Sequence, residues 1–400
     1  GGPDAGAEPM TPRHRLLTAA SLTPFVSSLL AIGLAFLVGG IFLEARGKDA
    51  FDAYRILFAR GLGTRDGLTE TFKQMAPLLI VSAGLLISLR AGIWNIGIDG
   101  QFLIGALMAG VVGAELVGDV PRWSMLLAGA VAGFAGGLAW AIVPAVLRVR
   151  WGLNEIITTL MMNYVAINVT SWLVKGPVRD KAHVAAQTKL IPFQDWLPHI
   201  PGTEVHVGLI VGLITVALVA VLFRSTVLGF MIDVLGRNPR AARHAGLPVG
   251  RLTALALLLS GGFAGLAGAN DVLGIQGLFK GNWNPGYGFT AFALVYLARL
   301  NAVWLVPFAF FFSFLLIGGQ SMPRRADVPT YYVDMLEGLM LLFFAAVVYL
   351  ERLYTPGIRR AVEEELDPIG SPGAIMDEPH SVLSPGNPPG ASVLPSGDPS

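Results

Sequence analysis

Long apolar runs with few charges fill most of this chain and restrict what it can fold into. Hydrophobic residues make up 54% and charged residues 14% of the 400 positions, whereas about a quarter of the residues in a soluble domain are charged. Several runs reach the roughly 20 residues that a helix needs to cross the hydrocarbon core of a bilayer. We therefore predict an all-α polytopic membrane protein embedded in a lipid bilayer.

Hydropathy predicts about ten membrane segments and one helix at the membrane surface. The eighth segment has about 12 residues and, at about 1.5 Å per residue, is too short to cross alone, so we expect a half-span beside a re-entrant segment. Charged and apolar residues mix in 45–69, which is typical of an interfacial helix. The predicted segments lie near 20–43, 70–90, 100–117, 123–147, 155–175, 205–224, 252–273, 288–299, 302–319 and 334–351.

The membrane domain is predicted over 20–351, between an N-terminal segment 1–19 and a tail 352–400. The last 34 residues of that tail include 19 Pro, Gly or Ser, a composition that cannot bury a core, so we expect them to be disordered. Ten segments leave both termini on one side. Lys and Arg are shared equally between the two sides, so their distribution does not fix the orientation. The cluster of arginines in and beside the loop 225–251 favours a cytoplasmic location for that loop and for both termini.

Composition also argues against several functions. The net charge of +1, without a long basic tract, argues against a nucleic-acid partner. The absence of cysteine excludes disulfides, thiolate metal sites and cysteine nucleophiles. The six histidines are scattered, and no H-E-x-x-H or comparable constellation is present. We therefore predict no metal site, no cofactor and no catalytic residue.

A polar break between the second and third segments is the best candidate for a solute path. It contains Trp94, Asn95, Asp99 and Gln101 together with two glycines. Polar, flexible backbone at membrane depth is tolerated only where it is buried in protein or lines a watery cavity. We therefore predict that these four residues line a path for a polar solute.

A related cluster with Trp283 and Asn284 lies 189 positions later, and both clusters read Gly-x-Trp-Asn-x-Gly. In the ten-segment topology the first copy lies at the cytoplasmic end and the second towards the outside. Equivalent positions on opposite sides are what an inverted repeat of five plus five segments would give, with a site near its two-fold axis. A chance match in a glycine-rich chain is the alternative.

Two other segments carry polar residues inside apolar sequence. Thr159, Asn163 and Thr170 lie with Glu155 within about 80° of one helix face, which predicts either a lining for a hydrophilic solute or hydrogen bonds between helices. For Glu155, a favourable position against the helix dipole is the stronger interpretation. In the seventh segment, Gly261, Gly265 and Gly268 predict close helix packing, and Asn270 at its end is a candidate for the path.

The loop 236–246 predicts one short surface helix of about five to seven residues. Asn238 is suited to cap it, the proline that follows to begin it, and Gly246 to end it. The helix presents Arg240 and Arg243, which favours docking onto another protein; binding of anionic lipid headgroups is the alternative.

Three motifs together resemble the permease subunits of bacterial ABC importers for nucleosides, within the larger branched-chain amino acid, ribose and simple-sugar permease family. They are 92–101, 152–164 and 236–246, in the family's order and spacing, and 286–289 extends the match. The resemblance covers about 70–350.

Four positions depart from the family pattern. The family usually has Phe at position 94 and Glu at position 99, where this chain has Trp94 and Asp99. It also usually has Arg near Asp233 and Gly near Arg299, so the docking surface and the start of the ninth segment are expected to differ in detail.

The resemblance implies a dimeric membrane channel in the bacterial cytoplasmic membrane. Its partners would be cytoplasmic ATPase subunits, a second permease subunit and an extracytoplasmic substrate-binding (lipo)protein. The chain itself has no G-x-x-x-x-G-K-[ST] loop for ATP. The coupling residues implied by the resemblance, which would dock in the ATPase, are Gly236, Arg237, Asn238, Arg240, Arg243 and Gly246.

The substrate class is open to alternatives. Aromatic and amide side chains suit a nucleoside, and the resemblance favours that class, but a simple sugar such as ribose or galactose suits them too. An ion-coupled secondary transporter is the rival of a different class, since it also uses broken helices and inverted repeats.

Overall fold

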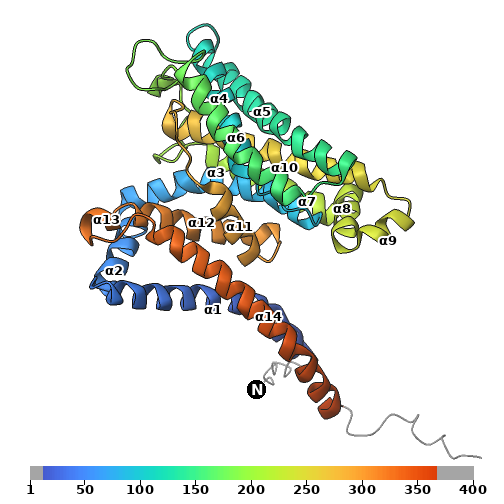
Figure 1. The fold of residues 1–400 in the computed structure, drawn as a ribbon. Helices are drawn as coiled ribbons and strands as arrows, with labels where there is room; N and C mark the ends of the chain where they lie inside the picture. The colour runs from blue at the N-terminus through green and yellow to red at the C-terminus, as the bar shows by residue number, and fades with distance from the viewer. Residues whose placement is uncertain (1–11, 367–400) are drawn as a thin grey trace, which may run out of the picture. The chain divides into compact units, whose positions relative to one another are not determined.

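The computed structural model describes residues 12–366, with side chains for 26–351, and these residues form helices without a β-strand. Within them, nine helices are long and apolar enough to span a membrane. Each coincides with a predicted segment, which confirms the fold class (Figure 1). The nine are α1 (Pro12–Ala45), α3 (Arg65–Arg90), α4 (Ile98–Leu116), α5 (Arg122–Trp151), α6 (Glu155–Lys175), α7 (Gly208–Ser225), α10 (Val249–Asp271), α12 (Ala302–Gly319) and α14 (Tyr332–Leu366).

The largest differences from the predicted boundaries are at the two ends of the membrane domain. Helix α1 starts at Pro12, earlier than the predicted residue 20, and α14 runs past residue 351 to Leu366. The tail predicted to be disordered, 367–400, lies outside the described residues. The described residues also divide after Val348 into two compact units, the second beginning at Tyr349.

The remaining helices are short. The predicted helix in 45–69 is α2, capped by the carboxylate of Asp49, which accepts from the backbone N of Asp52. The short eighth segment is confirmed as α11, with 11 residues. These connecting elements are α2 (Ala50–Gly61), η1 (Phe193–Asp195), α8 (Val227–Arg237), α9 (Pro239–His244), η2 (Val272–Gln276), α11 (Tyr287–Leu297) and α13 (Met322–Arg325).

The turn between α11 and α12 has an unusual backbone. Arg299 and Leu300 have φ values of +50° and +56°, a left-handed conformation that costs a residue with a side chain about 1–2 kcal/mol. A glycine at either position would adopt it without that cost. Ser28 of α1 donates to the carbonyl of Leu297 at 2.9 Å, which holds the turn against the first helix.

Helix α10 packs against α3, α4 and α5 through glycines, as predicted for packing. A Cβ atom on Gly265 would overlap the carbonyl oxygen of Gly133, and one on Gly105 would overlap the Cα of Gly265. A Cβ on Gly137 would overlap the carbonyl of Gly261. Because these glycines have no side chains, the backbones of α4, α5 and α10 can touch. The glycines therefore determine the distances between these helices at the centre of the bundle.

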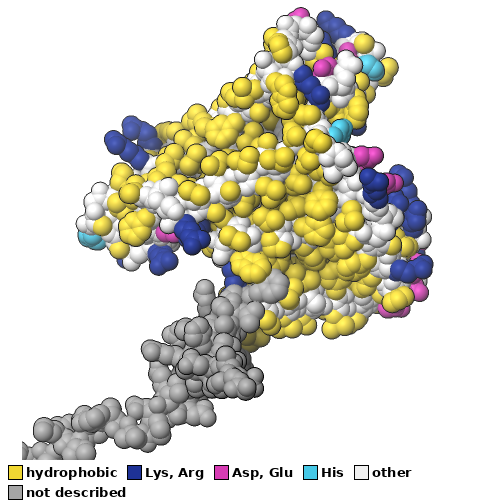
Figure 2. All heavy atoms as spheres, turned by 180° about the vertical axis from the view of Figure 1, so that it is seen from behind, with side chains coloured by type: hydrophobic (Ala, Val, Ile, Leu, Met, Phe, Trp, Pro, Cys, Tyr) yellow, Lys and Arg dark blue, Asp and Glu magenta, His cyan; other side chains and the backbone are white. Residues whose placement is uncertain are grey.

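The outer faces of the spanning helices are apolar. Leu127 and Val131 of α5 are 66% and 60% exposed, and Leu218 of α7 is 60% exposed. Figure 2 shows hydrophobic side chains in a broad continuous area on one face, with charged side chains gathered at its margins. Such a surface is stable when lipid tails cover it.

We expect Gly265→Ala to destabilise the protein by about 1–3 kcal/mol, because the new methyl group overlaps backbone atoms that cannot move independently. Gly338→Ala in α14 is the matched control, since a Cβ there meets nothing within 4 Å. Thermal unfolding of the purified protein in detergent measures both variants. Equal melting temperatures for the two would contradict this view of the packing.

Candidate functional site

The polar break begins where α3 ends and turns back towards the bundle. Gly92 has a φ of +73°, which a residue with a side chain rarely adopts. The backbone N of Ile93 donates to the carbonyl of Ser88 at 2.9 Å, and Gly97 is the N-cap residue of α4. Residues 93–97 therefore re-enter the protein before α4 begins.

The Asn95 side chain is completely buried and fully hydrogen-bonded. Its Nδ2 donates to Oε1 of Gln101 at 2.8 Å and to Oγ of Ser260 at 3.0 Å. In return, Nε2 of Gln101 donates to Oδ1 of Asn95 at 3.2 Å. Together these three side chains join the break to α4 and α10 by a satisfied network, which makes them supports of the break.

Thr159 and Asn163 bind the backbone of the same break. The hydroxyl of Thr159 accepts from the backbone N of Ile96 at 3.2 Å. Asn163 accepts from the backbone N of Gly100 at 2.8 Å and donates to the carbonyl of Ile96 at 2.7 Å. Of the two roles predicted for Thr159 and Asn163, these distances show hydrogen bonding between helices. Contact of these residues with a solute stays a prediction.

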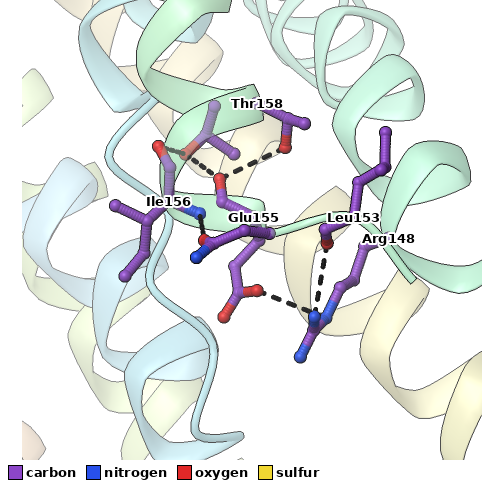
Figure 3. Close-up of polar contacts among 7 residues, drawn as sticks. Arg148, Leu153, Glu155, Ile156 and Thr158 are labelled. Atoms are coloured by element: carbon purple, nitrogen blue, oxygen red, sulfur yellow. Dashed lines mark hydrogen bonds and ion pairs between the residues drawn. The ribbon is translucent and has the colours of Figure 1, made fainter. Parts of the chain in front are cut away.

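Glu155 sits at the first position of α6, where Asn154 caps the helix by accepting from the backbone N of Ile156 at 2.9 Å. Figure 3 shows the Glu155 carboxylate turned towards Arg148 of α5, and their Oε2 and Nε atoms are 3.2 Å apart. Arg148 also donates to the carbonyl of Leu153 at 3.3 Å. Both the ion pair and the helix dipole stabilise this buried carboxylate, in line with the favoured interpretation.

Trp94 is the exposed member of the break, with 42% of its surface accessible. Its ring stacks on Phe292 of α11 and lies tilted against Tyr296, one turn further along that helix. The centroid distances are 6.2 Å to Phe292 and 5.7 Å to Tyr296, with interplanar angles of 19° and 37°. A partly exposed aromatic cluster therefore lies directly on the polar break.

The second cluster is built differently from the first. Trp283 is half-buried against Phe102 and Phe279, with ring centroids 5.9 and 5.6 Å away. Asn284 is exposed and accepts from the backbone N of Gly286 at 3.0 Å, just before α11. The asparagine equivalent to the buried Asn95 thus forms a local turn.

The two clusters begin near opposite ends of α7, and the residues that follow each cluster meet. Gly92 contacts Gly236 at the end of α8, whereas Gly281 donates to the carbonyl of Ala186 in the loop before α7. The backbone N of Gly288 then donates to Oδ1 of Asp99 at 2.7 Å, and these residues are 189 positions apart, the same offset as between the clusters. Both segments therefore run into the bundle towards each other, and the placement of the two clusters towards opposite sides of the membrane stays a prediction. The meeting of equivalent positions is what a two-fold axis between the halves requires.

Asn270 is buried at the end of α10, beside the ring of His206, and not in an open vestibule. His206 lies in the loop before α7, and burial lowers the pKa of its ring to about 4. The ring is therefore neutral at pH 7. Tyr287 is 3.4 Å from Asp271 in the same region, so this end of α10 forms a second buried polar cluster.

The short surface helix is confirmed as α9. Oδ1 of Asn238 accepts from the backbone N of Arg240 and of Ala241, both at 3.0 Å. Pro239 is its first residue and Gly246, with a φ of +78°, follows it. Arg237, Arg240 and Arg243 are exposed. Their side chains have no ion-pair partner in the described part of the chain.

An ion pair joins the α8–α9 segment to the start of the break. Nη2 of Arg90, at the end of α3, lies 2.5 Å from Oδ2 of Asp233 in α8. The same guanidinium lies 4.1 Å from the ring centroid of Phe223 in α7. A side chain on Gly236 would overlap the carbonyl of Arg90. The acidic residue at position 233 thus has its partner on α3.

Sequence reasoning missed Ser260, Phe292, Tyr296 and Arg90 as parts of this site. The spacing of Phe292 and Tyr296 places both on one helix face, and that was the available signal for an aromatic surface. Nothing in the sequence pairs Ser260 with Asn95, because contacts across a bundle depend on which helices are neighbours.

Comparison with known proteins identifies the class of this membrane protein. Residues 67–345 match the family described as "Branched-chain amino acid transport system / permease component". The chain is 33% identical to a glucose ABC transporter permease of Haloferax volcanii, over 88% of this chain and 96% of that protein. It is 30% identical to a guanosine ABC transporter permease of Bacillus subtilis, over 81% and 94%, and 28% identical to a nucleoside ABC transporter permease of Lactococcus lactis, over 82% and 92%.

These matches define the protein as a multi-pass membrane permease. The chain belongs to the branched-chain amino acid transport system permease family and acts as the permease subunit of an ABC importer.

We expect Asn95→Ala to reduce the free energy of unfolding by about 1–3 kcal/mol, because it leaves the amide of Gln101 and the hydroxyl of Ser260 buried without a partner. Asn284→Ala, the equivalent exposed position, is the matched control and should have little effect. Melting temperatures in detergent compare the two. An Asn95→Ala protein as stable as the control would show that the network does not support the break.

Proposed function

We propose that this permease carries nucleosides across the cytoplasmic membrane, and that Trp94 contacts the base. The observation that carries the proposal is the exposed indole of Trp94, which is stacked on Phe292, tilted against Tyr296 and part of the polar break. A nucleobase is flat and stacks on aromatic faces, with about 1–3 kcal/mol per base in other proteins. The names of the Bacillus and Lactococcus relatives agree with this substrate class.

The hydrophilic part of a nucleoside needs amide or hydroxyl partners. Asn284 and Asn282 are exposed near the second cluster, and Asp99 links that cluster to the first. In this proposal the buried amides of Asn95 and Asn163 hold the break in place, and exposed groups beside it contact the substrate.

A simple sugar is the second candidate, favoured by the 33% identity to the Haloferax glucose permease. Sugars also pack on aromatic rings and bind amides, so the same surface suits them. The two candidates differ in one respect. Binding of a nucleoside should depend on all the aromatic residues beside Trp94 on α11, because a planar base covers more of the aromatic surface than a sugar does.

The proposed mechanism uses α9 as the helix that docks into a separate ATPase subunit, with the loop and both termini in the cytoplasm. Its exposed arginines are suited to acidic partners. The preceding helix, α8, is joined to α3 at the start of the break by the ion pair between Arg90 and Asp233. A second permease subunit and an external substrate-binding protein complete the proposed importer. ATP binding would move α9 and, through α3, residues 93–97.

We expect uptake of radiolabelled purine or pyrimidine nucleosides by cells that express the complete importer, in preference to ribose, galactose and glucose. Trp94→Ala should raise the apparent KM for a nucleoside at least about fivefold through lost stacking. Trp123→Ala, with a tryptophan 65% exposed at the start of α5, is the matched control. Preference for glucose, or an unchanged KM in Trp94→Ala, would reject the nucleoside assignment.

We expect Arg240→Glu with Arg243→Glu to reduce transport at least about tenfold, because reversed charges oppose docking. The ATPase should dissociate or lose its stimulation by substrate, and membrane insertion should remain normal. Arg224→Glu, at an exposed arginine at the end of α7, is the control.

Uptake driven by a proton gradient in vesicles without ATP would instead favour the ion-coupled transporter.

A further inference from the structure

An apolar groove between α5 and α10 ends near two exposed arginines. The groove has a volume of about 490 Å³ and is lined by Ile142, Ala145, Val146, Val149, Arg150, Ala254 and Leu258. Ala145 is buried at its base, and Ile142 and Val146 are 45% and 43% exposed. Apart from Arg150, its walls carry only aliphatic side chains.

Each of the two helices that form the groove carries an arginine near the same end, and of the two only Arg150 lines the groove. Arg150 lies in the last turn of α5 and Arg251 in the first turn of α10. A Cβ on Gly250 would lie 3.2 Å from Cγ1 of Val149, so the two helix ends adjoin. Arg251 shares a helix face with Ala254 and Leu258, at spacings of three and seven residues.

Both arginines are exposed. Among the described residues, Arg150 and Arg251 have no ion pair, whereas the neighbouring Arg148 is bonded to Glu155. Trp151 follows Arg150 and is 61% exposed. Tryptophans are enriched at the headgroup level of a bilayer, which places the two arginines at the depth of lipid phosphates.

From this arrangement we propose that the groove is a binding site for one anionic phospholipid. Its phosphate binds between Arg150 and Arg251, and one acyl chain lies along Val146 and Leu258 towards the bilayer centre. Charge complementarity selects the headgroup: two cations at a membrane surface favour an anionic over a zwitterionic lipid. Because the groove is lined by aliphatic side chains that can contact an acyl chain, we expect it to bind a lipid in preference to a free phosphate.

Native mass spectrometry of the full-length permease, with the subunits that copurify, tests the site. The probes are phosphatidylglycerol, phosphatidylcholine and glycerol phosphate. We expect one tightly retained phosphatidylglycerol that phosphatidylcholine does not displace. Arg150→Gln with Arg251→Gln should weaken its binding roughly 30-fold. Val146→Trp, which fills the groove and keeps both charges, should also release it.

Three controls make the result decisive. Arg224→Gln should retain the lipid, and Arg150→Lys with Arg251→Lys should retain it if the Gln variant is unstable. Equal retention in the wild-type, Gln and Val146→Trp proteins would overturn the proposal, as would equal competition by glycerol phosphate. Since the chain has no cysteine, Val146→Cys provides a single thiol. A disulfide between two permease copies at this position would show that protein, and not lipid, covers the groove.

Discussion

Hydrogen bonding of the broken backbone at residues 93–97 is the interaction on which the rest of this structure depends. Backbone inside a bilayer must find its partners within the protein, since lipid offers none. Here Thr159 and Asn163 of α6 bind Ile96 and Gly100, and Ser260 of α10 binds Asn95. The break can therefore remain non-helical, and Trp94 can project from it.

Close packing makes that network possible. Glycines at the contacts of α4, α5 and α10 bring the backbones together, which places short side chains such as Ser260 within reach of the break. The same closeness applies at the other end, where Gly236 lies against the carbonyl of Arg90. In the proposed mechanism, a displacement of α8 and α9 would be transmitted to α3 by direct contact and by the Arg90–Asp233 ion pair.

The sequence predicted the elements of the fold well, because membrane spans are determined by the length of apolar runs. It also predicted α9, since Asn238, Pro239 and Gly246 are local signals for a cap, a first residue and an end. The contacts of the site were predicted less well. The partners Asn95 and Ser260 are 165 positions apart. The contact between Asp99 and Gly288 depends on how deeply two re-entrant segments enter the bundle, and hydrophobic periodicity does not define that depth.

The central claim is that movement of α9 reaches the break through Arg90 and Asp233. The most direct test uses the absence of cysteine: Trp94→Cys provides one thiol, whose labelling rate is measured in the assembled importer with and without a non-hydrolysable ATP analogue. The claim predicts a labelling rate that changes several-fold with nucleotide when Asp233 is present, and a much smaller change in Asp233→Asn. A rate that is insensitive to nucleotide, or a response that Asp233→Asn leaves intact, would contradict it.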